Sequence, residues 1–291
     1  MDPELESVCE LVRECGLLMR GADTSELLVN AKTGHANFVT DYDKRIQEKL
    51  RIGLAKAIPG ATFIGEEDAS QEYSEKGKFF IVDPIDGTTN FIKGLNASCI
   101  SVGFVVEGKA ELGVVYNPYL DEMFTARRGC GAACNGKRIK VSSEPLENGI
   151  VIFGTSPYNE ELSEKSFKLA YEYFKRAIDV RRTGSAALDL CSVASGRAEL
   201  FFELSLSPWD YAAGALIVEE AGGVVTDING NALSFSGKSS VLARNRIVHP
   251  ACYRSLSHKL RAIRAPAARP TSAQNAPANS TSCIWRGKGN M

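Results

Sequence analysis

The chain has 291 residues, and its 34 Lys and Arg nearly balance its 35 Asp and Glu, which leaves a formal net charge of −1. This balance argues against a nucleic-acid-binding protein and against a polybasic membrane-surface protein, because both carry an excess of basic residues. No apolar run approaches the ~20 residues of a membrane span, and the acidic start Met1–Glu4 has no apolar signal core. We therefore expect a globular cytoplasmic protein with neither a nucleic acid nor a membrane as its partner.

The first part of the chain predicts two helices followed by a run of strands. Asp2 and Pro3 are typical of a helix start, and apolar residues at helical spacing continue to about Gly21. A second helix is expected from near Asp43 to the stop at Pro59-Gly60. Apolar runs separated by turn residues then predict strands, including one β-hairpin, at residues 61–64, 79–82, 98–106 with 110–116, and 123–126.

The pattern restarts after residues 145–149, where we place a boundary. Beyond it, strands and helices are expected to alternate, with strands at 151–155, 198–204, 224–226 and 241–243, and helices at 159–177, 185–195, 208–221 and 249–263. Such alternation is typical of a layered α/β sandwich. Residues 1–145 and 146–263 are thus predicted to be two subdomains. The tail, 264–291, is predicted to be disordered, because residues 265–282 lack large apolar side chains.

The eight cysteines indicate no metal centre of their own. Most stand singly in apolar surroundings, as expected of buried thiols in a reducing compartment. Cys130 and Cys134 are the only close pair, and the two further thiol or imidazole ligands of a zinc site are absent nearby in the sequence. We therefore favour a structural role for this pair over a metal or redox role.

The most informative segment is Asp83-Pro84-Ile85-Asp86, which directly follows an apolar run. Pro84 biases Asp83 toward an extended conformation, and we expect a sharp turn that directs Asp83, the Ile85 carbonyl and Asp86 toward one centre. Such hard oxygen ligands suit Mg²⁺ or Mn²⁺ rather than zinc. If Gly87 to Thr89 open a helix, their N–H groups add an anion site beside the metal, as phosphoryl transfer requires. The alternative is that these acids only cap a turn.

Two further segments place acids after an apolar run or at a helix start. Glu66, Glu67 and Asp68 follow the first expected strand, and they could form only a solvated charge run. Asp210 follows Pro208 at the start of an expected helix, and it could be only an N-terminal cap.

Together these segments resemble the inositol monophosphatase family of magnesium-dependent, lithium-sensitive phosphatases. The resemblance is carried by motifs in matching order and spacing, namely Gly65-Glu66-Glu67, Asp83-Pro84-Ile85-Asp86-Gly87-Thr88-Thr89-Asn90-Phe91, and Trp209-Asp210-Tyr211-Ala212-Ala213-Gly214 with Glu219-Glu220-Ala221-Gly222-Gly223. The flanking segments Val39–Asp43 and Arg182–Ala187 fit as well. The resemblance extends from Met1 to Ile263 and excludes the tail. One departure is Ser185, where some relatives have threonine, and both residues carry a hydroxyl.

The resemblance implies a layered αβαβα sandwich with a larger N-terminal half and a smaller C-terminal half. It implies that the metal ions are held by Glu66, Asp83, Ile85 (through its carbonyl), Asp86 and Asp210. The residues expected to activate the attacking water are Asp43 and Thr88, together with the metal ligand Glu66. The residues expected to bind phosphate and the alcohol portion of the substrate are Asp86, Gly87, Thr88, Gly184, Ser185, Ala186, Glu203 and Asp210. Lys32 matches a lysine near an outer metal site.

The implied reaction is hydrolysis of a phosphate monoester, foremost inositol 1-phosphate, by a homodimeric enzyme that uses two or three Mg²⁺ ions, with Mn²⁺ as an alternative metal. Related enzymes with these motifs act on fructose 1,6-bisphosphate, adenosine 3′,5′-bisphosphate or histidinol phosphate, and Glu203 favours a hydroxyl-rich substrate among them. A catalytically idle homologue that acts by binding is a further alternative. A structural Ca²⁺ module is not expected, because the chain has no EF-hand loop.

Overall fold

The structure is a computed structural model, and it describes residues 2–22, 29–31, 38–68 and 76–248. The predicted last helix at 249–263 and the predicted disordered tail at 264–291 lie outside the described residues. None of the helices in the described part is long and apolar enough to cross a bilayer.

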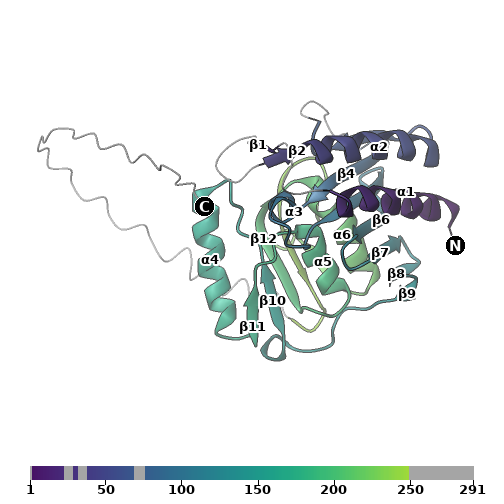
Figure 1. Cartoon of the computed structure of the whole chain (residues 1–291). Helices are drawn as coiled ribbons and strands as arrows, with labels where there is room; N and C mark the ends of the chain where they lie inside the picture. Colours follow the sequence, from purple (N-terminus) through teal and green to yellow (C-terminus); the bar gives the residue numbers. More distant parts are fainter. Residues whose placement is uncertain (1, 23–28, 32–37, 69–75, 249–291) are drawn as a thin grey trace, which may run out of the picture.

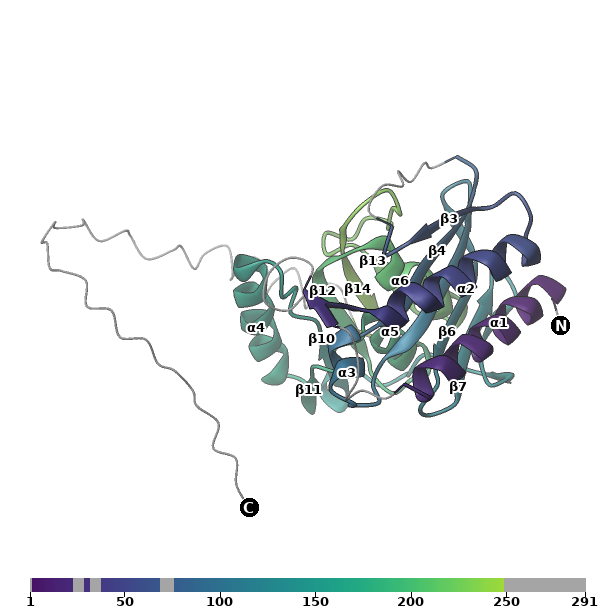
Figure 2. The same cartoon turned by 45° about the horizontal axis from the view of Figure 1, so that its top comes forward.

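The described residues form five layers of alternating helices and sheets (Figure 1, Figure 2). Helices α1 (Pro3–Arg20) and α2 (Asp41–Ala57) cover the outer face of a seven-stranded sheet. Helices α5 (Ala186–Ala194) and α6 (Pro208–Glu220) lie between that sheet and a five-stranded sheet. Helix α4 (Glu160–Phe174) covers the far face of the second sheet. The predicted αβαβα sandwich is therefore confirmed.

The larger sheet has the strand order β3-β4-β5-β6-β7-β8-β9, with β3 parallel to β4 and the other pairs antiparallel. The predicted hairpin is confirmed, with Glu107 and Gly108 both at positive φ in its two-residue turn, as right-twisted strands favour. The strands are β3 (Thr62–Gly65), β4 (Lys78–Asp86), β5 (Cys99–Val106), β6 (Lys109–Asn117), β7 (Glu122–Arg127), β8 (Gly131–Cys134) and β9 (Lys137–Arg138).

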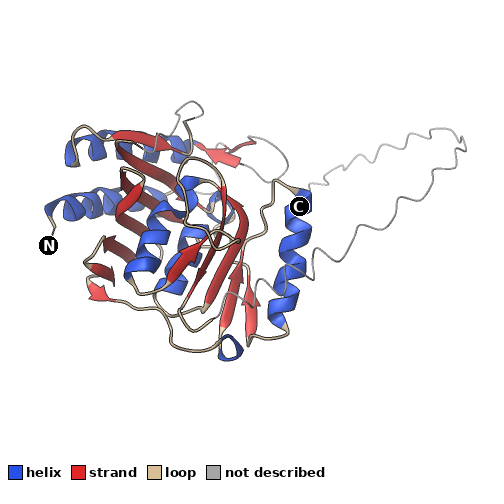
Figure 3. Cartoon of the chain, turned by 180° about the vertical axis from the view of Figure 1, so that it is seen from behind, coloured by secondary structure: helices blue, strands red, loops and turns tan. Residues whose placement is uncertain are grey.

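The smaller sheet has the order β11-β10-β12-β14-β13, in which β10 is parallel to both neighbours and β14 is antiparallel to both of its own. Figure 3 shows this sheet from behind, with helices on either side. Its strands are β10 (Ile150–Phe153), β11 (Asp179–Arg181), β12 (Leu200–Leu206), β13 (Val224–Thr226) and β14 (Ser239–Arg244). The remaining elements are β1 (Val29–Ala31), β2 (Phe38–Thr40), α3 (Thr88–Ile92) and the 3₁₀ turn Leu146–Asn148.

The predicted boundary at residues 145 and 146 falls at this 3₁₀ turn, between the two sheets. The largest apolar cluster nevertheless includes side chains from both sheets, such as Phe124 of β7 and Phe201 of β12. The division into subdomains 1–145 and 146–263 stays a prediction.

The central helix α6 packs directly against the larger sheet at two glycines that face it. A Cβ atom on Gly103 of β5 would lie 2.9 Å from the Cβ of Ala212, and one on Gly113 of β6 would lie 2.7 Å from the carbonyl oxygen of Ala213. Small residues at such a crossing allow backbones to approach, and the contact is tightly packed. This packing holds the N-terminal end of α6, with Asp210, against strands β4 and β5.

Candidate active site

Strand β4 delivers two of the predicted acids to one side of the sheet. The expected sharp turn at Pro84 is wrong: β4 continues through Asp86, with a register shift against β5 between Asp83 and Asp86. Asp83 pairs with Ser101 and Asp86 with Cys99, so three steps on β4 match two steps on β5. Because residues two apart in a strand share a face, the extra residue brings both carboxylates to the same face.

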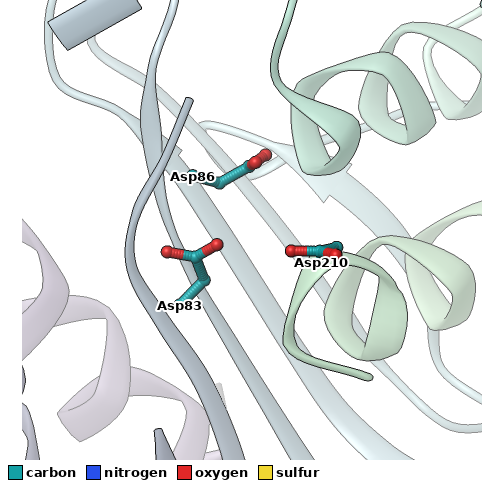
Figure 4. Close-up of side chains that lie close together, drawn as sticks. All are labelled: Asp83, Asp86 and Asp210. Carbon is teal, nitrogen blue, oxygen red and sulfur yellow. The ribbon is translucent and has the colours of Figure 1, made fainter. Parts of the chain in front are cut away.

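Helix α6 supplies the third acid of the cluster. Asp210 is the third residue of α6, and the backbone N–H of Ser207 donates to its Oδ2 at 2.7 Å. The alternative that Asp210 is only an N-terminal cap is therefore wrong: the N-cap is Ser207, and Asp210 closes the capping box from the third helical position. The same carboxylate also faces Asp83 and Asp86 (Figure 4). One oxygen from each of the three acids lies within 4.8 Å of the others.

The three clustered carboxylates repel one another in a place with little water. Burial, reinforced by the negative charge of Glu66, raises the pKa of Asp83 well above its ordinary value. Burial likewise raises the pKa of Asp86 to about 6, and that of Asp210 well above its ordinary value. Buried acids of like charge require either protons or a cation. An all-oxygen donor set at this spacing fits a hard divalent cation such as Mg²⁺.

The start of helix α5 holds Asp86 in place. The Ser185 hydroxyl donates to Asp86 Oδ2 at 2.6 Å, and the Ala187 N–H donates to the same oxygen at 2.7 Å. The Cys99 thiol lies 3.8 Å from this oxygen as a weak third donor. These three donors all contact Oδ2 and so hold the Asp86 side chain in one orientation. Its other oxygen, Oδ1, therefore points in a fixed direction.

Asp43 is buried, and one of its two carboxylate oxygens has a structural role. Its Oδ2 accepts hydrogen bonds from the Thr40 backbone N–H at 2.7 Å and the Thr40 hydroxyl at 2.5 Å, which closes a capping box at the start of α2. The helix therefore begins at Asp41, close to the predicted start near Asp43. Oδ1 of Asp43 is buried and has no hydrogen-bond partner among the described residues. Burial raises the pKa of Asp43 to about 7.

A cavity of about 490 Å³ opens over the acid cluster. The predicted site residues on its wall are Glu66, Asp83, Ile85, Asp86, Gly87, Thr88, Gly184, Ser185, Ala186, Glu203 and Asp210. Glu66 lies on this wall outside the three-carboxylate cluster. Asp43 is fully buried and does not line the cavity, and Lys32 lies outside the described residues.

The segment after Asp86 opens a helix, which is the condition for the predicted anion site there. Gly87 has a φ of +87°, which a side chain would oppose, and α3 starts at Thr88. The Thr88 hydroxyl donates to the Ile85 carbonyl oxygen at 3.2 Å. This helix has only five residues, so it is a short turn at the cavity wall.

Glu203 of β12 lies buried at the cavity wall, away from helix caps. The Ser156 N–H donates to its Oε1 at 2.8 Å. Gly154 makes room for it, because a Cβ atom there would overlap both carboxylate oxygens. Burial raises the pKa of Glu203 to about 7.

The acidic run after β3 divides into two parts. Asp68 accepts hydrogen bonds from Gln47 at 3.2 Å and from Arg51 at 2.6 Å, so it fastens the loop to α2. The Glu67 N–H donates to the Gln47 side chain at 3.0 Å. The alternative was that these acids form only a solvated charge run. It fits Asp68 only in part, because the charge of Asp68 is paired with Arg51.

Sequence reasoning missed several residues of the cavity wall. Asp189 of α5 is buried, accepts a hydrogen bond from the Thr183 hydroxyl, and has its pKa raised well above its ordinary value by burial. The available signal was a single acid in the otherwise apolar run Ala186–Ala194. Arg182 and Lys238 also line the cavity. Arg182 begins a segment that the resemblance includes but was given no role, and Lys238 carried no signal in the sequence.

Comparison with known proteins gives consistent results. The model of the inositol monophosphatase family matches residues 1–263. The Nus factor SuhB of Escherichia coli K12 is 38% identical over 232 residues, which are 79% of this chain and 87% of that protein. The structure of an IMPase from Thermotoga maritima matches with a TM-score of 0.79 and 32% identity, over 90% of this chain and 100% of the other. A structure described as an IMPase/NADP phosphatase complexed with Mg²⁺ and phosphate matches with a TM-score of 0.75 and 26% identity, over 85% and 92%.

Proposed function

Because this chain belongs to the inositol monophosphatase family, we propose that it is a Mg²⁺-dependent phosphatase that hydrolyses a small phosphate monoester, foremost inositol 1-phosphate. The observation that carries the proposal is the cluster of Asp83, Asp86 and Asp210 at a cavity whose wall also holds Glu203. The cavity volume of about 490 Å³ suits a small substrate. The similar structure described as complexed with Mg²⁺ and phosphate supports the same chemistry.

The proposed ligands for two or three ions are the oxygens of Glu66, Asp83, Asp86 and Asp210 and the carbonyl oxygen of Ile85. When bound, Mg²⁺ supplies a Lewis acid that polarises the phosphoryl group and lowers the pKa of water. We expect Asp83 to be the position most sensitive to substitution, because it is nearly inaccessible to solvent and its charge interacts with those of Glu66, Asp86 and Asp210. Ser185 and the Ala187 N–H hold Asp86 against the repulsion of its neighbours.

Asp43 and Thr88 are proposed to orient the attacking water. Oδ1 of Asp43 is a buried acceptor without a hydrogen-bond partner in the part of the chain that the structure describes, and the other oxygen of the carboxylate is held by Thr40. A carboxylate held on one oxygen keeps the other in a constant direction, which is what positioning a nucleophile requires. The Thr88 hydroxyl is similarly fixed by its bond to the Ile85 carbonyl.

The substrate is proposed to lie between the acid cluster and β12. The Gly87 and Thr88 backbone would bind phosphate oxygens, while the loop residues Gly184 to Ala186 would contact the alcohol portion. Glu203 accepts from the Ser156 N–H with Oε1, and within the described part of the chain no hydrogen bond reaches its other oxygen, which can therefore accept from a substrate hydroxyl. A buried acceptor of this kind discriminates in favour of polyols, because a substrate without the hydroxyl leaves it unpaired.

A substrate panel with free phosphate as the readout tests this proposal. The panel comprises inositol 1-phosphate, fructose 1,6-bisphosphate, adenosine 3′,5′-bisphosphate and histidinol phosphate, each assayed with Mg²⁺, without Mg²⁺ and with added Li⁺. We expect Mg²⁺-dependent turnover, fastest for inositol 1-phosphate and inhibited by Li⁺. The variant Asp83→Asn should fold and lose activity, whereas the matched variant Asp68→Asn, outside the cavity, should keep it. Normal turnover by Asp83→Asn would refute the site.

The name of the Escherichia coli relative, a Nus factor, favours a second candidate in which the chain acts by binding another molecule. In that case no member of the panel is hydrolysed, and the acid cluster serves the fold or a partner. The expectation that no nucleic acid is bound stays a prediction under either candidate.

A further inference from the structure

Two buried acids on the cavity wall lie outside the three-carboxylate cluster, Asp189 of α5 and Glu203 of β12. Asp189 is 2% exposed and Glu203 is 8% exposed. One oxygen of each acid is held by the protein, because the Thr183 hydroxyl donates to Asp189 Oδ1 and the Ser156 N–H donates to Glu203 Oε1. Within the described residues, no hydrogen bond reaches the second oxygen of either acid, and neither of these oxygens is fully enclosed. Both are therefore acceptors that a ligand in the cavity can reach.

The guanidinium of Arg182 lies close to both acids. It lines the cavity, and its Nη1 is 2.5 Å from where a Cβ atom on Gly184 would lie, while its Nη2 is 3.5 Å from the Thr155 hydroxyl. Burial raises the pKa of both acids, and the positive charge of Arg182 partly offsets that rise. In the described part of the chain, Arg182 nevertheless forms no ion pair with either acid. Asp189, Arg182 and Glu203, which we call the wall group, thus face one cavity without pairing directly.

The chemistry of the wall group suits hydroxyl groups. A hydroxyl both donates and accepts a hydrogen bond, whereas a guanidinium only donates and a carboxylate only accepts. A substrate hydroxyl can therefore donate to one of the acids and accept from Arg182. A second phosphate is less suitable, because one cation faces two acids and the wall group offers no net positive charge. An apolar substrate is also unsuitable, since it would leave buried polar groups without partners.

We propose that Asp189 and Arg182 join Glu203 in recognising two hydroxyls of the substrate, which makes the preferred substrate a polyol monophosphate rather than a bisphosphate or a simple alkyl phosphate. This inference rests on the proposed function, because a phosphate at the acid cluster directs the alcohol portion toward the wall group. Helix α5 connects the two ends of the substrate, since Ser185 at its start holds Asp86 and Asp189 follows one turn later. One turn rises ~5.4 Å, which is comparable to the width of a hydroxylated six-membered ring.

Steady-state kinetics on two matched phosphates tests the role of Asp189. Inositol 1-phosphate is compared in Mg²⁺ with cyclohexyl phosphate, which has the same ring without the free hydroxyls. We expect the wild type to favour inositol 1-phosphate by about 100-fold or more in kcat/KM. In Asp189→Asn the amide oxygen can keep the bond from Thr183, so an NH₂ group replaces the free acceptor. The KM for inositol 1-phosphate should rise about tenfold with kcat within about threefold, and the kinetics on cyclohexyl phosphate should not change.

Arg182→Gln tests the cation of the wall group, and its exposed position tolerates the change. The KM for inositol 1-phosphate should rise about threefold or more. Arg181→Gln is the matched control, because Arg181 is the adjacent exposed arginine and does not line the cavity. It should behave as the wild type. If Arg182→Gln impairs fructose 1,6-bisphosphate more than inositol 1-phosphate, the guanidinium binds a second phosphate and the proposal is wrong.

Thr183→Val separates recognition of the substrate from support of the loop. We expect it to raise the KM for inositol 1-phosphate alone, because it frees the Asp189 carboxyl group. If Asp189 only supports the loop, Thr183→Val impairs both substrates alike and Asp189→Asn impairs neither. That result would overturn the proposal. Circular dichroism verifies that each variant folds.

The wild type distinguishes this proposal from the proposed function. Equal turnover of inositol 1-phosphate and cyclohexyl phosphate would overturn the role of the wall group and leave the phosphatase assignment intact. If the wild type hydrolyses neither compound, the proposed function fails, and calorimetric titration with inositol 1-phosphate in Mg²⁺ then tests the wall group. Binding about tenfold weaker in Asp189→Asn would support the wall group. Absent binding, or binding that Asp189→Asn leaves unchanged, would overturn it.

Discussion

Gly154→Ala tests whether Glu203 recognises the substrate. Gly154 has an ordinary backbone conformation, so alanine introduces only a Cβ atom. That atom would lie 2.6 Å from Glu203 Oε1 and closer still to the rest of the carboxylate. Oε1 must therefore retreat by about 0.8 Å to reach ordinary contact at 3.4 Å, and the other oxygen must move further. The Glu203 side chain is displaced, while the backbone N–H of Gly154 can keep its bond to Phe202.

The magnitude follows from the hydrogen bond that is lost. Displacement stretches the 2.8 Å bond from the Ser156 N–H to Oε1 and removes the alignment of the oxygen that would meet a substrate hydroxyl. A hydrogen bond to a charged group is worth about 2 kcal/mol, which corresponds to a KM raised about 30-fold. The acid cluster is untouched, so kcat should change by less than about threefold.

Steady-state kinetics on inositol 1-phosphate in saturating Mg²⁺ measures this effect. Gly237→Ala is the control, because a Cβ atom there meets no atom within 4 Å. It should behave as the wild type. If Gly154→Ala folds and keeps the wild-type KM, Glu203 does not bind the substrate. If kcat falls and KM does not, Glu203 acts on the reacting group, and the assignment to the alcohol portion is wrong.

Three further predictions concern metal, stability and packing. Burial raises the pKa values of Asp43 and Glu203 to about 7, so the folded chain binds protons that the unfolded chain releases above about pH 4. The melting temperature of the metal-free protein should therefore fall as pH rises through about 4 to 7, and Mg²⁺ at about pH 8 should restore it. A melting temperature that does not change over this pH range would contradict the reasoning. Ser185→Ala removes the 2.6 Å hydrogen bond to Asp86 and should raise the Mg²⁺ concentration for half-maximal activity about tenfold. If that Mg²⁺ concentration is unchanged, this hydrogen bond does not position Asp86. Gly113→Ala presses a Cβ atom against the backbone of α6 and should lower the unfolding free energy by about 1–3 kcal/mol in urea; full stability would show that the contact can relax.

The sequence predicts the layered fold well, because strong local patterns coincide with tertiary contacts. The hairpin from β5 to β6 was predicted at nearly its observed limits, since its apolar runs flank a Glu107-Gly108 turn. Short strands were missed, as with β11 (Asp179–Arg181), because three residues carry too little pattern. Residues 249–263, predicted as a helix, remain a prediction.

The candidate site was predicted by residue type better than by geometry. Pro84 indicated a turn, but the chain instead extends through a register shift that only pairing with β5 can produce. Asp189 escaped notice because its importance comes from burial beside Thr183, which is a tertiary property. The roles of the predicted site residues stay predictions, since geometry brings them to one cavity without showing what they do.

Two of the carboxylates to which the proposed function gives a role also close a helix cap with one oxygen. Asp43 closes the cap of α2 and Asp210 closes the cap of α6. In a relative that has lost catalytic activity, substitution of either acid would still remove a helix cap. Each such substitution would lower the stability of the fold by about 1 kcal/mol. Drift toward an inactive descendant is therefore expected first at Glu66 or Asp83, which start no helix. Intact acids at 43 and 210 alone are thus weak grounds for inferring activity in any relative.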